Sequence, residues 1–318
     1  MAGQFTSTNR IVAVKEETSP GVFQEMAQAD YKIEFLDAET MDFDFNPERP
    51  GKVARGDMAE GQSFSTFRQL TGYTLNTLWR HDGLENTFPT IDPLLKAAGL
   101  IGEVVGGKAR YSFKGIQPCK TFSIQSTELN CGETPDGIMT QARGCVPNLV
   151  ISADGIGQQV KLGFEVVGAY ENELDVANPI RTLEGYATGA TEKLMNTTFQ
   201  IGATPFILHS YNLNLNNNTV IVPDPSKPGC IYQGKVVGAD PVLTATVQMI
   251  DLATSGLDDA LAGDLVFDNI TINGLGWDIV ITEGNIRNLT KGDADNIMTQ
   301  ELEIELRRFH FEKKEYVS

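Results

Sequence analysis

The residues that most often carry chemistry are few in this chain and are poorly spaced for it. The sequence contains three histidines, His81, His209 and His310, and none stands at metal-ligand spacing from another histidine or a cysteine. We therefore expect each histidine to be structural or exposed.

The cysteines also lack the spacing of a reactive or metal-binding motif. The four of them are Cys119, Cys131, Cys145 and Cys230, and no two form a C-x-x-C pair. A zinc knuckle and a thioredoxin-type redox motif both need such a pair. In a reducing compartment, we expect the cysteines to be small buried hydrophobic residues.

One acidic segment has the opening spacing of a calcium-binding loop. Residues 42–46 read Asp-Phe-Asp-Phe-Asn, which places Asp42 and Asp44 at the first and third positions. An EF-hand loop also needs a glycine at its sixth position and a bidentate glutamate at its twelfth, where this chain has Pro47 and Val53. We therefore do not expect an EF-hand, and the acidic run at 293–296 is better interpreted as a turn.

Nucleotide and hydrolase motifs are missing as well. The sequence has no P-loop and no G-x-S-x-G turn, and residues 155–160 lack the third glycine of a dinucleotide-binding loop. Trp79 and Trp277 are most simply core or interface aromatics. The sequence thus predicts no catalytic, cofactor-binding or metal-binding residues, and it predicts a protein that is not an enzyme.

Charge argues against a protein that binds DNA tightly. The 318 residues include 42 Asp and Glu but only 25 Lys and Arg, so the formal net charge is −17. A surface of this sign repels polyanions. The chain also lacks a signal-peptide-like apolar region and any run of about 18 apolar residues. We expect synthesis in a cytosol and no membrane partner.

Strands must position most of the polar residues, because the dominant pattern is alternation of apolar and polar residues. The pattern is clearest at 301–307, where Glu301, Glu303 and Glu305 alternate with leucine and isoleucine. It recurs at 41–45, 160–166, 211–216 and 243–249. With 31 Gly and 14 Pro between short strands, the sequence predicts a mainly antiparallel β fold.

Two short helices are also predicted. The first covers 92–98, with Asp92 as the expected N-cap, Pro93 at the first helical position and Gly99 just past the end. The second covers 257–262 and is capped by Ser255.

These elements occur twice in the same order, which predicts a tandem duplication. Each copy reads as a strand, a loop rich in Pro and Gly, two strands, a helix, further strands and a closing strand, at 160–166 and 301–307 respectively. The predicted parts are an N-terminal arm (1–20), a first β-rich domain (21–167), a connector (168–197) and a second β-rich domain (198–318). Identity between the copies is low, so the order of elements carries the inference.

Several segments, in their order along the chain, resemble the tail tube proteins (major tail proteins) of long-tailed, siphovirus-type bacteriophages. None of the segments is catalytic or diagnostic alone. The segments are VKEETSPG at 14–21, RGDM at 55–58, TIDPLLKAAGL at 90–100, ARG at 142–144, VKLGFE at 160–165 and SYNLNL at 210–215.

The resemblance implies a β-sandwich or barrel-like fold with a flanking helix, and rings that stack into a tube for DNA ejection. The family's rings have sixfold or pseudo-sixfold symmetry, so a duplicated chain favours three copies per ring over six. The implied partners are other copies of the chain, a tape measure protein, a tail terminator and distal tail proteins. DNA would pass through without specific binding. The implied location is the virion tail, after assembly from the host cytoplasm.

Acidic strand residues are the candidates for lumen-facing or subunit-facing positions, because a channel that passes DNA should not bind phosphates. These are Asp42, Asp44, Glu301, Glu303 and Glu305, while Phe43, Phe45, Leu302, Ile304 and Leu306 are expected in the core. An ordinary solvated strand face is the alternative interpretation.

Contacts between rings are predicted for the N-terminal arm and the loops at 46–62 and 217–230, which we expect to be loosely ordered in the free subunit. The candidate residues are Pro47, Arg49, Arg55, Asp57, Pro223, Asp224 and Lys227. The loop at 222–229 differs in length and composition from its counterpart, so equivalent roles are in doubt.

Two other functions stay open. A distal tail or baseplate ring protein of the same fold would share these features. A carbohydrate-binding or hydrolytic β-sandwich would need a cleft with paired carboxylates and exposed aromatics, which sequence cannot place in space.

Overall fold

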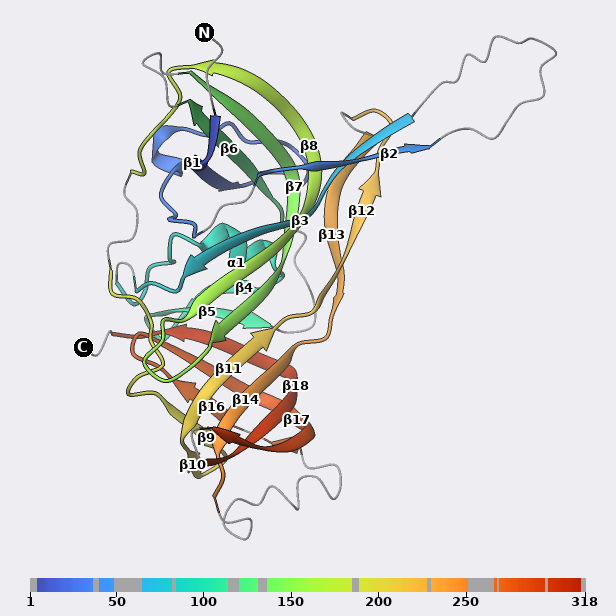
Figure 1. The fold of residues 1–318 in the computed structure, drawn as a ribbon. Coiled ribbons are helices and arrows are strands. Elements are labelled where there is room, and N and C mark those ends of the chain that lie inside the picture. Colours follow the sequence, from blue (N-terminus) through green and yellow to red (C-terminus); the bar gives the residue numbers. More distant parts are fainter. Residues whose placement is uncertain are drawn as a thin grey trace, which may run out of the picture.

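The chain is built almost entirely of antiparallel strands, as the alternating pattern predicted (Figure 1). The computed structural model describes residues 5–36, 40–48, 65–81, 84–113, 120–130, 136–184, 189–227, 230–250, 266–267, 269–294 and 297–315. Its helices in this part of the chain are α1 (Asp92–Ala97) and a single 3-10 turn, η1 (Gln28–Asp30). The mainly β fold is confirmed.

The strands divide into a first half (residues 5–177) and a second half (residues 198–315), which lie one above the other in Figure 1. The first half contains β1 (Phe5–Glu16), β2 (Phe43–Glu48), β3 (Ser65–Leu78), β4 (Ile101–Val105), β5 (Lys108–Phe113), β6 (Phe122–Asn130), β7 (Asp136–Ala153) and β8 (Lys161–Ala177). The second half contains β9 (Thr198–Ile201), β10 (Thr204–Phe206), β11 (Leu208–Asn214), β12 (Asn217–Pro223), β13 (Ile231–Ala239), β14 (Val242–Gln248), β15 (Val266–Phe267), β16 (Ile270–Asn273), β17 (Trp277–Ala294) and β18 (Ile297–Lys313).

Strand pairing follows the same order in both halves. In the first half β1 pairs with β6, β6 with β7, β7 with β8, and β8 with β3. In the second half β9 pairs with β16, β16 with β17, β17 with β18, and β18 with β14. Each half also extends a two-stranded hairpin, β2–β3 or β12–β13. The topology therefore repeats as the order of sequence elements does, although the domain boundaries stay a prediction.

The second half closes on itself. β10 pairs with β9 and runs through Ile207 into β11, which pairs with β14. The backbone N–H of Gln248 donates to the Ile207 carbonyl oxygen at 2.8 Å, so the pairing continues across the junction. Apolar side chains fill the interior, among them Leu213, Leu243, Ile270, Leu302 and Ile304, all with no exposed surface. This barrel-like unit therefore has a packed apolar core.

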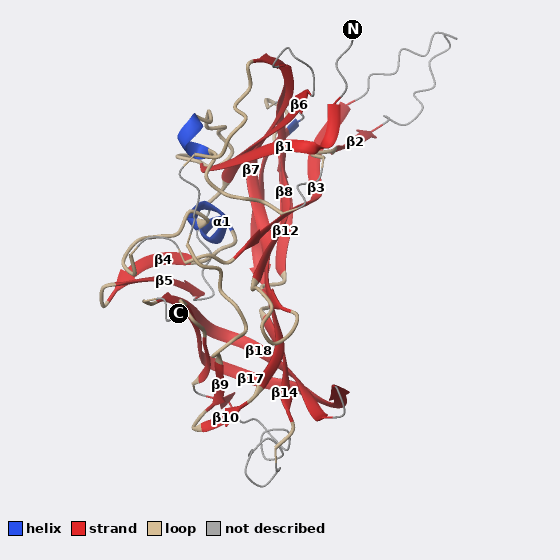
Figure 2. Cartoon of the chain, turned by 60° about the vertical axis from the view of Figure 1, so that its left-hand side comes forward, coloured by secondary structure: helices blue, strands red, loops and turns tan. Residues whose placement is uncertain are grey.

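The two halves share one sheet and one core. β11 pairs with β7 from Asn214↔Val150 to Tyr211↔Ala153, and β5 pairs with β18 from Arg110↔Glu312 to Phe113↔Phe309. A single cluster of buried hydrophobic residues includes side chains from both halves. Figure 2 shows α1 and the β4–β5 hairpin on one side of the long strands β7 and β8.

Helix α1 forms where it was predicted, although its cap differs. The N-cap is Ile91, and Asp92 begins the helix, where its carboxylate accepts hydrogen bonds from Lys96 Nζ (2.7 Å) and the Tyr111 hydroxyl (2.7 Å). The helix buries Leu94 and Leu95 against the sheet. The second predicted helix, 257–262, lies outside the described residues.

The structure differs from several expectations about strands. The two strands expected after the first loop rich in Pro and Gly are one strand, β3, because an irregularity between Leu70 and Tyr73 keeps both parts paired with β8. Residues 5–16 of the predicted N-terminal arm, expected to be loosely ordered, form β1, because β6 pairs with them. Residues 168–177, expected to begin the connector, continue β8 because β7 extends far enough to pair with them. Residues 217–223, expected in a loop, form β12 because β13 pairs along their length.

Residues 190–194 of the predicted connector run extended between two other segments. Glu192 N–H donates to the Trp79 carbonyl oxygen (2.7 Å), and Val160 N–H donates to the Glu192 carbonyl oxygen (2.9 Å). The connector is thereby fixed to the end of β3 and to the start of β8.

Two cysteines can be assessed. Cys145 is buried, as expected, and burial raises the pKa of its thiol well above the usual value. Cys230 is only partly buried, so the expectation was wrong there: it sits in the turn before β13 with a φ of 56°. Cys119 and Cys131 lie outside the described residues. No helix in the described ranges is long and apolar enough to cross a membrane.

Candidate assembly site

The predicted carboxylates of the last strand share one face of β18. Glu301 is exposed, and Glu303 and Glu305 are half-buried. The alternating residues, Leu302, Ile304 and Leu306, are at most 2% exposed, which confirms their expected place in the core. Period-two alternation therefore predicted both faces of this strand correctly.

Neighbouring strands extend this face with uncharged polar side chains. Thr244 and Thr246 of β14 stand opposite Glu303 and Glu301. Asn212 of β11 continues the row toward Ser152 of β7. Paired residues of adjacent strands point to the same side of a sheet. We define the polar face by Thr74, Asn148, Ser152, Glu165, Asn212, Thr244, Thr246, Glu301, Glu303 and Glu305.

Few cations lie beside this face. Arg287 bonds Glu305 through Nε at 3.1 Å and Asp240 at 3.2 Å, and its hydrogen bond to Glu305 is the main reason that the pKa of the guanidinium is raised. Lys161 stands opposite Ser152, so it belongs to this face, and it pairs with Asp154 at 3.0 Å. Within the described part of the chain, Glu301 and Glu303 make no ion pair. The face therefore offers a phosphate backbone more repulsion than attraction.

The other two candidate acids lie far along the sheet from this group. Asp42 and Asp44 are exposed at the start of β2, and β3, β8, β7, β11 and β14 stand between β2 and β18 in the strand order. Asp44 accepts a hydrogen bond from the Thr71 hydroxyl. The structure thus separates the predicted carboxylates into two groups. Phe43 is partly buried against the core, as expected, and the Phe45 side chain lies outside the description.

A cleft of about 270 Å³ opens beside Asp42. Its wall includes Glu128 and Glu173, and the Arg68 guanidinium lies 4.8 Å from the centre of the Tyr170 ring. Carboxylates outnumber cations around Asp42, so this end of the sheet is locally acidic.

The described part of the sheet has several open edges; β1 and β4, for example, each pair with one strand only. Residues 286–294 of β17, a strand inside the order, pair only with β18 within the described chain. At one end of the order, β2 pairs only with β3, and the segment before it makes a single bridge to β3, Leu36↔Asn76. Open edges carry unpaired backbone N–H and C=O groups and are natural sites for pairing with another chain.

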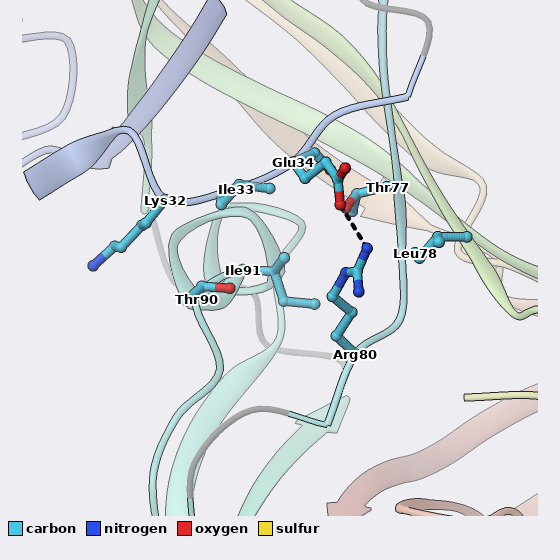
Figure 3. Close-up of a pocket in the computed structure, with 8 residues that line it drawn as sticks. All are labelled: Lys32, Ile33, Glu34, Thr77, Leu78, Arg80, Thr90 and Ile91. Carbon is cyan, nitrogen blue, oxygen red and sulfur yellow. Dashed lines mark hydrogen bonds and ion pairs between the residues drawn. The ribbon is translucent and has the colours of Figure 1, made fainter. Parts of the chain in front are cut away.

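Figure 3 shows how the segment before β2 is attached to the edge of the sheet, at the end of β3. The Glu34 carboxylate lies 2.5 Å from the Arg80 guanidinium, and the Thr77 hydroxyl donates to the Glu34 carbonyl oxygen at 2.7 Å. The cavity between Ile33 and Ile91 holds only about 10 Å³, roughly the room of one water molecule. This site fixes a strand edge and has no space for a larger ligand.

A buried carboxylate that sequence reasoning missed ties three segments together. Glu17 is 2% exposed and accepts hydrogen bonds from Gly21 N–H (2.6 Å), Gly144 N–H (2.7 Å), the Ser123 hydroxyl (2.9 Å) and the Thr121 hydroxyl. Four neutral donors satisfy the buried charge. The segments 14–21 and 142–144, both part of the resemblance, meet at this point.

Arg143, next to that carboxylate, binds the turn end of the β12–β13 hairpin, which we call the arm and which is distinct from the N-terminal arm at 1–20. Its guanidinium donates to the carbonyl oxygens of Tyr232 (2.6 Å) and Ile231 (2.8 Å), and Nε lies 2.5 Å from the Glu171 carboxylate. In Figure 1 the arm rises from the second half along the strands of the first half. Arg143 therefore holds the turn end of the arm close to β7.

The candidate loop residues are only partly described. Asp224 is exposed in the turn of the arm, where hydrogen bonds from the Ser226 hydroxyl and backbone lower the pKa of its carboxyl. Pro223 ends β12, and Lys227 N–H donates to the Asp224 carbonyl oxygen at 3.2 Å. Pro47, expected in a loop, belongs to β2, because an edge strand tolerates proline. Arg49, Arg55 and Asp57 lie outside the described residues.

A second buried carboxylate joins the connector to the second half. Glu192 is 4% exposed and accepts from the backbone N–H groups of Leu275 (2.5 Å) and Gly276 (2.9 Å). Burial raises the pKa of this carboxyl, although the two backbone donors and Lys314 oppose the shift. Trp79 and Trp277 pack nearby with ring centres 5.1 Å apart, which confirms that both tryptophans are core aromatics. Nothing in the sequence around Glu192 indicated that this connector glutamate would be buried.

These features define a class of protein: a mainly antiparallel β chain with a repeated pairing order, one polar acidic face and several open sheet edges in its described part. No family model matches the sequence, and no curated protein is significantly similar to it.

Proposed function

We propose that this chain is the major tail tube subunit of a long-tailed bacteriophage, a structural protein whose copies assemble into stacked rings around a channel for DNA. The observation that carries the proposal is the repeated pairing order, which gives one chain two similar units, with open edges at residues 286–294 of β17 and at β2.

The junction between the halves indicates how copies would associate. Within the chain, β7 of one unit pairs with β11 of the other. β17 occupies the place of β7 in the second unit, and its outer edge from 286 to 294 has no such partner in the described chain. Pairing of this edge with the segment before β2 in another copy would repeat the internal junction. A contact between two different surfaces closes into a ring when the rotation is right.

The proposed ring contains three chains, because each chain would supply two of six similar units. The interior of the closed second half is filled, so the channel must lie at the centre of the ring. The polar face is the candidate lining, since its carboxylates, amides and hydroxyls offer DNA no cluster of positive charge.

Electron microscopy of the purified chain tests the proposal. We expect rings, and tubes made of many identical rings, as concentration rises. Discrete rings that never stack would favour the alternative of a distal tail or baseplate ring protein. A chain that stays monomeric under all assembly conditions would overturn both.

A further inference from the structure

We propose that one structural water molecule binds in a small cavity between the two halves, where it accepts hydrogen bonds from Trp79 and Trp277 and donates one to Glu192. The site belongs to the fold of the single chain, so it is independent of how copies assemble.

The cavity has room for one water molecule and no larger ligand. Its volume is about 10 Å³, and roughly 10–15 Å³ is the least space that holds a buried water. The wall is built from three parts of the chain. Trp79 and Val160 come from the first half, Glu192 from the connector, and Tyr211 and Trp277 from the second half.

Two buried hydrogen-bond donors line this cavity. Trp79 and Trp277 are each 2% exposed, and their rings lie 5.1 Å apart. Neither indole Nε1 has a hydrogen-bond partner among the described residues. An indole N–H can only donate, and a buried donor is destabilising unless it meets an acceptor. A water oxygen has two lone pairs, so a single molecule can accept from both rings.

The Glu192 carboxylate supplies the acceptor for the water's own protons. Its two oxygens accept from the backbone N–H groups of Leu275 and Gly276, and a carboxylate has about four acceptor positions in all. A Cβ at Gly274, which lines the cavity, would clash with Glu192 Oε1, so this oxygen lies against the cavity wall. Burial, and then the charge of Glu192, raise the pKa of the Tyr211 hydroxyl, which is therefore close to the same carboxylate.

One water molecule therefore meets the polar groups of three segments. Two indole donors and one carboxylate acceptor give it three hydrogen bonds, the usual number for a buried water. These bonds join the residue that follows β3, the connector and the first residue of β17. The water is part of the contact that fixes the connector to both halves.

A crystal or electron-microscopy map that resolves ordered water tests the proposal directly. We expect one density peak in the cavity, within about 3.2 Å of an indole nitrogen and of a Glu192 oxygen. A map without a peak there, or with a protein acceptor bonded to both indole groups, would overturn the proposal.

Nuclear magnetic resonance gives a second, independent test. The chain has two tryptophans, so a ¹⁵N-labelled sample shows two indole N–H signals, and Trp79→Phe assigns them by removing one. Each signal should show a dipolar contact with a long-lived water. Absence of this contact in the unchanged chain would contradict the proposal.

Two variants of Glu192 provide a matched comparison. Glu192→Gln keeps an acceptor oxygen and should keep the water contact. Glu192→Leu removes the acceptor and should abolish the contact in a chain that circular dichroism shows to be folded. A folded leucine variant with an unchanged water contact would show that the carboxylate does not hold the water. If this variant does not fold, the map and the spectrum of the unchanged chain decide.

Discussion

At the scale of single residues, two buried glutamates organise the chain. Glu17 receives four hydrogen bonds, and Glu192 receives two from the turn between β16 and β17. Each carboxylate joins segments far apart in sequence. Both carboxylates hold backbone segments in place. The effect of removing either one should therefore be measured as a change in the free energy of unfolding.

Glu17→Gln should lower the free energy of unfolding by about 3 kcal/mol. The amide keeps one acceptor oxygen but replaces the other with an NH2 group, which would face the N–H and O–H donors that surround the carboxylate. The measurement is urea denaturation followed by tryptophan fluorescence. Glu25→Gln, at an exposed carboxylate on the same segment, should change stability by no more than about 0.5 kcal/mol. Equal stability of the two variants would show that the hydrogen bonds to Glu17 contribute little.

Glu192 should make stability depend on pH. Its folded pKa lies above the unfolded value of 4.5, so the fold binds its proton more tightly than the unfolded chain does. Its contribution is therefore fully present below pH 4.5 and is lost as the pH rises through the folded pKa.

Comparison with Glu192→Gln isolates this contribution. The stability of the unchanged chain relative to this variant should fall as the pH rises from 4.5 through the folded pKa, roughly one order of magnitude in the folding constant for each unit by which the pKa is raised. The exposed Glu184→Gln should show no such trend. A difference that stays constant with pH would contradict the raised pKa.

Residue types alone gave part of this picture. Alternation placed Glu301, Glu303 and Glu305 on one face of a strand, because a period of two is a local property. Glu17 and Gly144 stand in two of the segments that carried the family resemblance, yet nothing local indicates that they touch. Contacts across more than a hundred residues depend on topology, which alternation does not contain.

At the scale of elements, the arm depends on close backbone packing. A Cβ at Gly234 would lie 2.8 Å from Val146 Cγ2 and 2.9 Å from the Val167 carbonyl oxygen, whereas a Cβ at Gly238 would meet nothing within 4 Å. The first glycine therefore lets β13 lie directly on β7 and β8. The second is free of such contact.

Gly234→Ala should lift the arm from the sheet at a cost of about 1–3 kcal/mol, as overpacking typically does. Hydrogen exchange should then speed up in β12 and β13 while β17 and β18 stay protected. Gly238→Ala on the same strand should leave exchange unchanged. Equal protection in both variants would mean that the arm is held by other contacts, such as those of Arg143.

The sequence predicted the existence of most strands better than their ends. The joining of two expected strands into β3 and the extension of β8 through 168–177 both depend on a partner strand that supplies hydrogen bonds. Strand length is set by the neighbour as much as by the strand's own residues. The helix over 92–98 was predictable because its proline and glycine signals are local.

At the scale of the whole molecule, charge and topology support the same account. Changing Glu301, Glu303 and Glu305 together to Lys alters the formal charge of the chain from −17 to −11. If these residues line the channel, release of DNA from assembled particles should slow. The slowing should weaken as the salt concentration rises. The logarithm of the apparent DNA-binding constant should fall with the logarithm of the salt concentration, with a slope of up to about −0.9 per phosphate contact.

The control variant makes the same change of net charge at residues outside the polar face. Glu25, Glu184 and Glu315 are exposed, and changing all three to Lys gives the same −11. DNA release should then match the unchanged particles. Equal release rates in both triple variants would contradict the assignment of the polar face to the channel.

The mass of one isolated ring tests the central claim most directly. Three copies of a 34.7 kDa chain give about 104 kDa, and native mass spectrometry or single-particle imaging of a ring resolves this from other numbers. The duplicated topology predicts three chains arranged with pseudo-sixfold symmetry. A ring of six chains, near 208 kDa, or a closed two-fold dimer would contradict the claim that each chain supplies two units of the tube.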